Sequence, residues 1–565
     1  MADARPDYSP WSSDFRMEVS VGAALGHIRS FMHPQVHIVD GSSKEEAVFM
    51  KGVRSYGYKA GKPVIELPPD AAKNLMWMTR LDTGSLSGKA ETKIFPSSKL
   101  NLVAWHKTYV DIVIHAPRES SGSLIRLLKS IVAADYFGTR RPHLTIELPP
   151  DIDSPTMGFL QNLIWPPLDP SGGLHSSQVT LRHRIPRAKL GTEEASTHFL
   201  ENFYPARPKE SHVLILSPQA EVSPLYYHYL IYNLLEYKYS SYGSTSPEAD
   251  SLMGISLELP SHHLNDTEPF SPPLNKLVSG LGKDGEPVET AGPPETLPFL
   301  WQAPNSNAAL YFGDKWIELH TFFTARISAR QINRSPLPSR PKLVSSKYPA
   351  WMEYMLEFMH VKGYNLLYPH FESRDSIVTV HNELYQPPEE FASSASSSAD
   401  ITPLPTQSNQ DPNEPFTVDP QTISTPHSHS PEIALLKSSL INLLPHAGDL
   451  PELSSIPLLT SSGDLLLAST SYKHADSFAE TFSREIGGCK VSKRVEPWKR
   501  FSVDELFCYD DEDEDQAVGT IHSLPEEGHM EQGPGQESIS RLFAEKSTTD
   551  DEFSGHLARQ AGSSR

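Results

Sequence analysis

The strongest pattern of apolar and polar positions in the chain covers residues 211–238, SHVLILSPQAEVSPLYYHYLIYNLLEYK. Positions 213–216 form a short apolar run typical of a strand buried on both faces, and Pro218 ends it because proline cannot donate to a strand ladder. Ser223 then suits the N-cap of a helix whose apolar positions recur every three or four residues through Tyr237. The pattern predicts a strand, a polar turn over 217–221, and a helix.

The same alternation of strand-like and helix-like segments extends over residues 108–390. Strands are predicted at 110–114, 144–148, 179–181, 213–216, 254–259 and 365–368, and helices at 121–136, 193–204, 225–237, from about 315, and at 348–363. Strands that alternate with helices form a parallel sheet with helices on its faces, so we predict an α/β fold. Ligands of such open sheets bind at the carboxyl ends of the strands, which makes the turn over 217–221 the expected place for chemistry.

The first 80 residues form a separate pattern. A helix is predicted at 15–31, a strand at 36–39, a helix at 43–55 and a second strand at 64–67. One βαβ unit behind a single helix is only part of a sheet, so we interpret residues 1–80 as a partial Rossmann-like domain and expect the chain to begin inside a domain. Residues 81–107 lack sustained periodicity, are rich in Ser, Gly and Lys, and are predicted to be a linker.

Beyond the α/β domain the composition changes twice. Residues 391–432 hold mostly Ser, Pro, Thr and Asn, which predicts a disordered linker. Residues 433–508 carry a β-hairpin pattern at 456–459 and 465–468 and a helix pattern at 475–486, which predicts a small C-terminal α+β module. Residues 509–565 are acidic and rich in glycine, and we expect a disordered tail there.

Composition argues against some classes of function. The formal net charge of -21 at pH 7 disfavours nucleic acid as a partner, because phosphate binding needs basic stripes and none is visible. No window approaches the roughly 20 apolar residues of a membrane span, and the first residues lack the features of a signal peptide, so the chain alone is predicted to be soluble. Cys489 and Cys508 are the only cysteines. We expect two buried thiols, which would pair only in a lumenal protein.

Segments between Tyr109 and Phe391 resemble a known family. The first strand with APRESSGSLIRLLKSI, the acid-bearing turn after the next strand, and VLILSPQAEVSP together resemble the nucleotide-sugar half of a GT-A fold. WQAPNSNAALYFGDKWIELH, EYMLEFMHVKGYNLLYPHF and TVHNEL are similar to a fungal branch of the family 2 glycosyltransferases. The resemblance implies a GT-A-like, mostly parallel sheet, a nucleotide-sugar donor, and residence in the Golgi or ER lumen, since members of this branch are usually anchored in a membrane by an N-terminal helix.

The resemblance also assigns a role to the turn over 217–221. Family members hold Mn²⁺ or Mg²⁺ with a DxD after the strand that VLIL matches, and this ion stabilises the departing nucleoside diphosphate. Here the motif reads Ser217-Pro218-Gln219, so both carboxylates are absent. Ser217 and Gln219 are neutral oxygen ligands that hold a divalent cation poorly, and only Glu221 supplies charge to a metal in this turn. The alternative is a protein cation that binds the diphosphate: Arg118, Arg182 or Arg184.

Other family roles fall near the ends of the predicted strands. Pro117 and Arg118 match the place where family members meet the base and ribose, and Glu147, with Asp151 close behind, matches the acid after the second strand. Both acids suit helix capping equally well. An inverting transfer also needs a carboxylate base that deprotonates the acceptor. The candidates for this base are Asp266, Asp314 and Glu318.

The leading hypothesis is therefore a family 2 type glycosyltransferase that transfers a sugar from a nucleotide donor to an unknown glycan, lipid or protein acceptor, with inversion. The absent DxD keeps a second hypothesis open, a catalytically inactive GT-A protein that binds a nucleotide sugar or a partner glycosyltransferase. A dinucleotide-dependent enzyme is disfavoured because no GxGxxG follows any predicted strand. The sequon Asn265-Asp266-Thr267 favours a lumenal site only slightly, since such tripeptides arise by chance.

Overall fold

The structure, a computed structural model, describes residues 10–34, 37–41, 46–61, 64–68, 71–81, 108–118, 120–136, 139–166, 177–184, 191–240, 246–273, 296–332, 342–371, 375–382, 388–391, 434–435, 439–444, 448–489 and 500–508. The chain divides into two compact units, Met1–Tyr509 and Asp510–Arg565, and every described residue lies in the first. Apart from residues 81 and 391, the linkers predicted over 81–107 and 391–432 fall outside the described residues. The tail predicted over 509–565 does so entirely.

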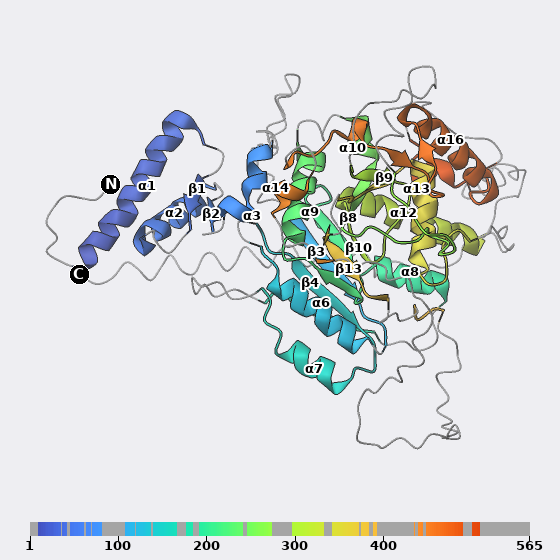
Figure 1. Ribbon diagram of the computed structural model, residues 1–565, viewed down its shortest axis with the longest axis horizontal. Helices are drawn as coiled ribbons and strands as arrows, with labels where there is room; N and C mark the ends of the chain where they lie inside the picture. The colour runs from blue at the N-terminus through green and yellow to red at the C-terminus, as the bar shows by residue number, and fades with distance from the viewer. Residues whose placement is uncertain are drawn as a thin grey trace, which may run out of the picture. The chain divides into compact units, whose positions relative to one another are not determined.

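A ten-stranded mixed sheet forms the centre of the first unit (Figure 1). Its strands are β3 (Tyr109–His115), β4 (His143–Leu148), β5 (Val179–His183), β6 (Ser211–Leu216), β8 (Leu252–Ser256), β9 (Phe299–Trp301), β10 (Ala308–Tyr311), β11 (Asn365–Tyr368), β15 (Leu458–Leu459) and β16 (Leu465–Leu466). Across the sheet they follow the order β16, β15, β9, β11, β8, β10, β6, β3, β4, β5. The predicted α/β class with a mostly parallel sheet is thus confirmed.

The strand directions define two edges of this sheet. β3 pairs in parallel with β4 and β6, β4 pairs in parallel with β5, and β11 pairs in parallel with β8. β10 runs antiparallel to both β6 and β8. β3, β4, β5, β6, β8 and β11 therefore all end at one edge, which we call the carboxyl edge. β10 begins at the carboxyl edge and ends at the opposite, amino edge.

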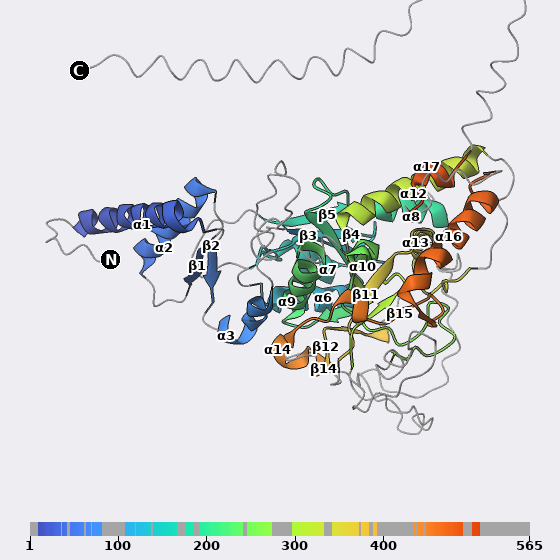
Figure 2. The same ribbon diagram turned by 90° about the horizontal axis from the view of Figure 1, so that it is seen from above.

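Helices cover the sheet because its central strands are apolar on both faces; all six residues of β6, for example, are buried. The helices are α6 (Ser121–Ala133), α7 (Ser154–Gln161), α8 (Thr192–Leu200), α9 (Tyr226–Leu234), its π-helical continuation η2 (Leu235–Tyr239), α10 (Pro247–Ser251), α12 (Gly313–Ile332) and α13 (Trp351–Lys362). α12 and α13 contact each other and α8, and both views show these three helices side by side (Figures 1 and 2).

Several strands were not predicted from the sequence. β9 and β10 occupy the segment for which only the following helix was expected, and β7 (Ala220–Val222) begins within the turn predicted over 217–221. β7 pairs antiparallel with β13 (Val378–Val380) outside the central sheet. A further parallel pair joins β12 (Asp375–Ser376) to β14 (Ala434–Leu435).

The C-terminal segment extends the central sheet. The predicted hairpin and helix are present as β15, β16 and α16 (Ala468–Glu485), together with α14 (Leu440–Leu443), η5 (Leu453–Ser455) and α17 (Val503–Leu506). β15 pairs in parallel with β9. Tyr232 Oη donates to Gly448 O over 2.9 Å, and Tyr237 Oη donates to Pro451 O over 2.8 Å. Residues predicted as a separate module thus form part of the same core as the sheet.

The N-terminal segment contains the predicted βαβ unit. It consists of α1 (Pro10–Met32), β1 (His37–Asp40), α2 (Ala47–Ala60) and β2 (Val64–Leu67), followed by α3 (Ala71–Asn74) and η1 (Met76–Arg80). β1 and β2 pair in parallel, with His37 opposite Val64. Among the described residues no helix, α1 included, is both long enough and apolar enough to cross a bilayer.

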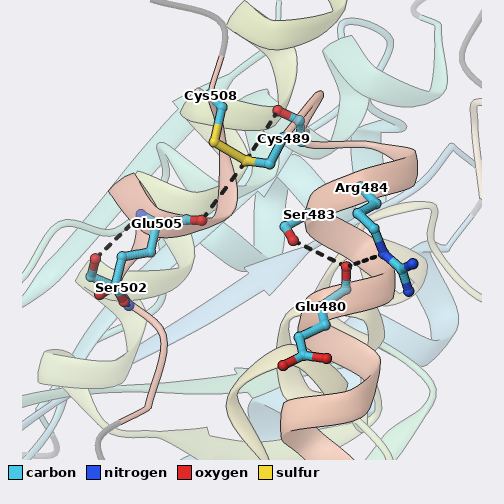
Figure 3. Close-up of a disulfide and its surroundings, with 8 residues drawn as sticks. Glu480, Ser483, Arg484, Cys489, Ser502, Glu505 and Cys508 are labelled. Carbon is cyan, nitrogen blue, oxygen red and sulfur yellow. Dashed lines mark hydrogen bonds between the residues drawn. A yellow bond between two sulfur atoms is a disulfide. The ribbon is translucent and has the colours of Figure 1, made fainter. Parts of the chain in front are cut away.

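Cys489 and Cys508 form a disulfide, with their Cα atoms 5.0 Å apart (Figure 3). The expectation of two buried thiols was therefore wrong. The fold brings the end of α16 against residues 506–508: Cys508 N donates to Gly487 O over 2.9 Å. A Cβ atom at Gly487 would lie 1.8 Å from Leu506 O, so only glycine allows this approach. Sequence spacing alone gave no sign of it.

Candidate functional site

The carboxyl edge contains a point at which the order of the strands reverses. β4 and β5 follow β3 on one side, whereas the chain continues from β5 to β6 on the other side of β3. In open α/β sheets the crevice between the carboxyl ends of two such strands binds ligands. Here the crevice lies between the residues after β3, Ala116 to Arg118, and those after β6, which begin at Ser217.

Pro117 and Arg118 form the β3 side of this crevice. Ser120 Oγ donates to Pro117 O over 2.7 Å, which fixes the start of α6. The Arg118 side chain is 57% exposed and lies 3.8 Å from Asp151 Oδ2, in a side chain that is 84% exposed. An exposed ion pair at this distance contributes little stability. The structure thus brings Pro117, Arg118 and Asp151 together, and the guanidinium is accessible to an anionic ligand.

Glu147, the last residue but one of β4, is a buried carboxylate whose side chain is 1% exposed. Its Oε2 lies 2.9 Å from His115 Nδ1 and accepts from Asn202 Nδ2 over 2.5 Å. Its Oε1 lies 3.2 Å from His198 Nδ1 and 3.7 Å from Arg184 Nε. Burial by itself raises the pKa of Glu147, but the hydrogen bond and charge of His115 and the charge of Arg184 outweigh it and hold the pKa below its ordinary value. Glu147 is thus ionised at neutral pH.

A cleft of about 410 Å³ opens beside this carboxylate, between β5 and α8. Its lining residues are Glu147, Arg182, His183, Arg184, His198, Glu201 and Asn202. Arg184 is 5% exposed and donates to Ala116 O over 2.6 Å, and Arg182 donates to Asn202 O over 3.0 Å. Fixed cations beside a buried acid suit a ligand that carries negative charge and also offers a hydrogen-bond donor.

The turn over 217–221 lies half-buried beside the crevice and is held on two sides. Ser217 N donates to Asn307 O over 2.8 Å, and Gln219 N donates to Ser217 Oγ over 3.3 Å. Glu221 lies in β7, where its Oε2 is 2.9 Å from His381 Nε2. The turn therefore lies at the carboxyl edge, as predicted, but Ser217 and Glu221 make contacts within the protein.

The residues of this turn do not fit a divalent cation. Mn²⁺ and Mg²⁺ sites need several oxygen ligands with carboxylates among them, and Glu221, the only acid of the turn, already lies against His381. Within the described parts of the chain, no group of three or more His, Cys, Asp and Glu side chains could hold a metal ion. The protein cations at this edge, Arg118 and Arg184, are the remaining groups for an anionic ligand.

Sequence reasoning missed one buried acid at the carboxyl edge. Glu258 follows β8, and its carboxylate accepts from Asn305 Nδ2 over 2.9 Å and from Asn307 Nδ2 over 3.0 Å. Burial raises the pKa of Glu258, and the two amide hydrogen bonds offset this only in part. Because Asn307 O also accepts from Ser217 N, Glu258 lies close to the turn after β6. The signal in the sequence was an acid at the end of the apolar run GISLEL.

Asp314 and Glu318, two of the predicted bases, lie at the opposite edge of the sheet. Asp314 follows β10 at the start of α12, so the length of β10 separates it from Ser217. Lys238 Nζ lies 2.6 Å from Asp314 Oδ2; burial alone raises the pKa of Asp314, but Lys238 brings it below its ordinary value. Glu318 accepts from Tyr364 Oη over 2.8 Å. At the amino edge neither acid reaches a ligand bound beside Ser217.

Asp266, the third predicted base, lies in a turn beyond β8. Its φ is 58°, in the left-handed region, and its carboxylate forms an ion pair with Lys347. Thr267 N donates to Asn265 Oδ1 over 3.2 Å in the same turn. Asp266 therefore has a structural partner, and the geometry favours Glu258 over all three predicted bases.

The N-terminal segment matches a known family. Residues 1–88 match the family described as the SPBC1E8.03c N-terminal domain. The match covers the βαβ unit, α3 and η1, and ends before β3, so it does not reach the central sheet. No curated protein matches the chain.

Proposed function

We propose that the chain is a glycosyltransferase of family 2 type, which binds a nucleotide sugar at the carboxyl edge and transfers the sugar, with inversion, to a glycan, lipid or protein. The observation that carries this proposal is the strand reversal beside β3, with Arg118, Glu147 and Arg184 gathered around it. Nucleotide-binding α/β sheets use this point for their ligands. The mostly parallel sheet supports the GT-A-like core that the sequence resemblance implies.

The cleft between β5 and α8 is suited to the phosphates of the donor. Arg184 Nε makes no hydrogen bond with a described residue and lies 3.7 Å from Glu147 Oε1, which also lies 3.2 Å from His198 Nδ1. Unsatisfied buried polar atoms are costly. A phosphate oxygen would satisfy Arg184, a ligand hydroxyl beside it would donate to Glu147, and Arg118 would meet the rest of the diphosphate.

The proposed transfer needs a base and a charge that stabilises the leaving group. The acceptor oxygen bonds to the anomeric carbon while the bond from that carbon to the phosphate oxygen breaks, and the nucleoside diphosphate leaves with the electron pair. Glu258, whose raised pKa suits proton transfer, takes the acceptor proton. Arg118 and Arg184 neutralise the charge that develops on the diphosphate. No step is routed through Mn²⁺ or Mg²⁺, because the turn after β6 does not fit either ion.

An inactive nucleotide-sugar-binding protein is the second candidate. The observations that favour it are the neutral side chains of Ser217 and Gln219 and the contact of Glu221 with His381. If the protein is inactive, the cleft binds the nucleotide sugar, but no side chain lowers the barrier to sugar transfer. Glu147 and Arg184 would serve binding in both cases, so only the chemical step separates the two candidates.

Titration of the full chain with UDP- and GDP-sugars, with and without Mn²⁺, tests both candidates. Donor hydrolysis that is lost in Glu258→Gln, with donor affinity retained, supports the transferase. Donor binding without hydrolysis under every metal condition supports the inactive protein. The matched control is Asp314→Asn, which removes an acid at the amino edge and leaves hydrolysis unchanged. A protein that binds no nucleotide at all overturns both candidates.

Residence in the Golgi or ER lumen is part of the proposal. The disulfide between Cys489 and Cys508 supports it, because disulfides persist in oxidising compartments. Asn265 of the predicted sequon is exposed, as a glycan acceptor must be. The expected result for protein from its own cells is a glycosidase-sensitive mass shift that is smaller in Asn265→Gln and absent when Asn333 of the second sequon, Asn333-Arg334-Ser335, is changed as well. An unglycosylated protein with two free thiols would contradict lumenal residence.

A further inference from the structure

A short segment that follows β13 in the chain, residues 388–391, reaches the cleft. Residues 388–391 form a turn in which Phe391 N donates to Pro388 O over 3.0 Å. We call these four residues the strap. Glu390 accepts from Ala350 N, at the start of α13, over 2.8 Å, and Lys342 Nζ lies 5.3 Å from the centre of the Phe391 ring. These contacts hold the strap against the N-terminal end of α13.

Glu389, the residue before these two anchors, reaches the buried cation of the cleft, Arg184. Arg184 Nη2 donates to Glu389 Oε1 over 3.0 Å, and the Glu389 side chain is 28% exposed whereas that of Arg184 is 5% exposed. Arg184 is fixed by Ala116 O, and its Nη1 lies 2.6 Å from His115 Nε2. The guanidinium is therefore a rigid partner. The carboxylate of Glu389 can turn toward solvent.

The ion pair between Arg184 and Glu389 depends on which other negative charges lie beside Arg184. A buried guanidinium needs negative charge beside it, and removal of one partner of such a pair is strongly unfavourable. Glu147 supplies part of that charge at 3.7 Å, without a hydrogen bond to Arg184. Glu389 supplies the rest through a direct hydrogen bond. An anion that bound at Nη2 of Arg184 would offer the same charge to the same donor, so the anion and Glu389 cannot both occupy that position.

We propose that Glu389 holds the place of a ligand phosphate at Arg184, and that an anionic ligand displaces the strap when it binds. The ligand class is a phosphate or diphosphate ester, which rests on the proposed nucleotide-sugar function for its nucleoside part. The strap lowers the affinity of the cleft for such ligands, because the binding-competent state is only a fraction of the population. When the ligand leaves, Glu389 returns and neutralises Arg184.

Isothermal titration of the full chain in metal-free buffer tests this, with inorganic pyrophosphate and UDP as probes. Glu389→Gln should bind pyrophosphate about fivefold more tightly than the wild type, since an ion pair of this kind is worth about that factor. Glu194→Gln is the matched control. It removes the same charge from an exposed position in the first turn of α8, outside the lining of the cleft, and should change affinity by less than about twofold. Equal affinity of Glu389→Gln and wild type, or equal gains in both variants, overturns the proposal.

Hydrogen exchange gives a second readout that does not depend on affinity. The Ala350 amide donates to Glu390 only while the strap is seated, so saturating pyrophosphate should speed its exchange in the wild type. An amide within β4 should not change. Exchange at Ala350 that is unchanged or slower at saturation means that the ligand leaves the strap in place, and overturns the proposal.

The two probes separate this proposal from the proposed function. If pyrophosphate distinguishes Glu389→Gln from wild type and UDP binds no more tightly than pyrophosphate, the strap is supported and nucleotide-sugar binding fails. If UDP binds the wild type and the change at Glu389 has no effect, nucleotide binding is supported and the strap fails. If neither probe binds any variant, both fail.

Discussion

Reduction of the disulfide between Cys489 and Cys508 should loosen residues 500–508 and leave the central sheet intact. This segment is bound to the core by backbone contacts at both ends: Lys362 Nζ donates to Phe501 O over 2.7 Å, and Cys508 N donates to Gly487 O over 2.9 Å. A local opening breaks these hydrogen bonds. While the disulfide is intact, however, Cys508 stays tethered to the end of α16.

The size of the effect follows from the length of the closed loop. The cysteines are separated by 19 positions, and a cross-link over such a loop removes chain entropy worth about 3 kcal/mol from the open state. Reduction should lower the free energy of local opening by that amount. Since about 1.4 kcal/mol corresponds to a factor of ten, amide exchange through this opening should become roughly a hundredfold faster.

Hydrogen exchange measured by mass spectrometry on the peptide that contains Cys508 is the assay. The wild type with reductant and the double variant Cys489→Ser/Cys508→Ser should give the same fast rate, and a peptide from β3 serves as the internal reference. A change of less than about threefold at Cys508, or a peptide map of the unreduced protein that shows two free thiols, would refute the reasoning. The original expectation of unpaired cysteines would then be correct.

Three further predictions concern the carboxyl edge. Glu258→Gln should lower donor hydrolysis at least about a hundredfold. Burial raises the pKa of Glu258, so the wild type loses stability as pH rises through that pKa, whereas Glu258→Gln does not. Denaturant midpoints of the two proteins at pH 4 and pH 8 measure this difference. Glu147→Gln should cost about 3 kcal/mol at neutral pH. Since the pKa of Glu147 is lowered by folding, its contribution is present above the ordinary glutamate pKa and lost as pH falls, so variant and wild type should converge in acid; a constant gap would contradict this. Ser217→Asp combined with Gln219→Asp should weaken UDP binding without metal and restore it with Mn²⁺, because two carboxylates then face the crevice; calorimetry that shows no metal dependence would contradict the site.

The locally encoded parts of the fold were predictable from the sequence. β6 and β11 lie where apolar runs predicted them, and α12 and α13 begin within a few residues of their expected starts. Each of these elements is specified by its own pattern of apolar residues. Arg118 and Glu147, which the family resemblance singled out, lie after β3 and near the end of β4, at the carboxyl edge.

The parts that depend on strand direction were not predictable. The run NAALYF contains no strong strand signal, and it becomes β10 only because β6 and β8 offer ladders on both sides. Gly254 allows this pairing, since a Cβ atom there would lie 2.0 Å from Leu310 O. The antiparallel direction of β10 is what puts the start of α12 at the amino edge. The sequence alone does not show at which edge Asp314 and Glu318 lie, and it did not single out Glu258.

A ligand at the carboxyl edge is expected whether or not the chain is active. Glu147 Oε1 and Arg184 Nε are buried beside a cleft without hydrogen bonds from described residues, and such atoms are costly unless a partner arrives. Two carboxylates in the turn after β6 would repel a diphosphate unless a cation stood between them. Ser217 and Gln219, in their place, add no such repulsion. If the proposed function holds, we expect an anion to bind here more readily without a metal than it would beside an empty DxD, and transfer then requires Glu258 to reach the acceptor.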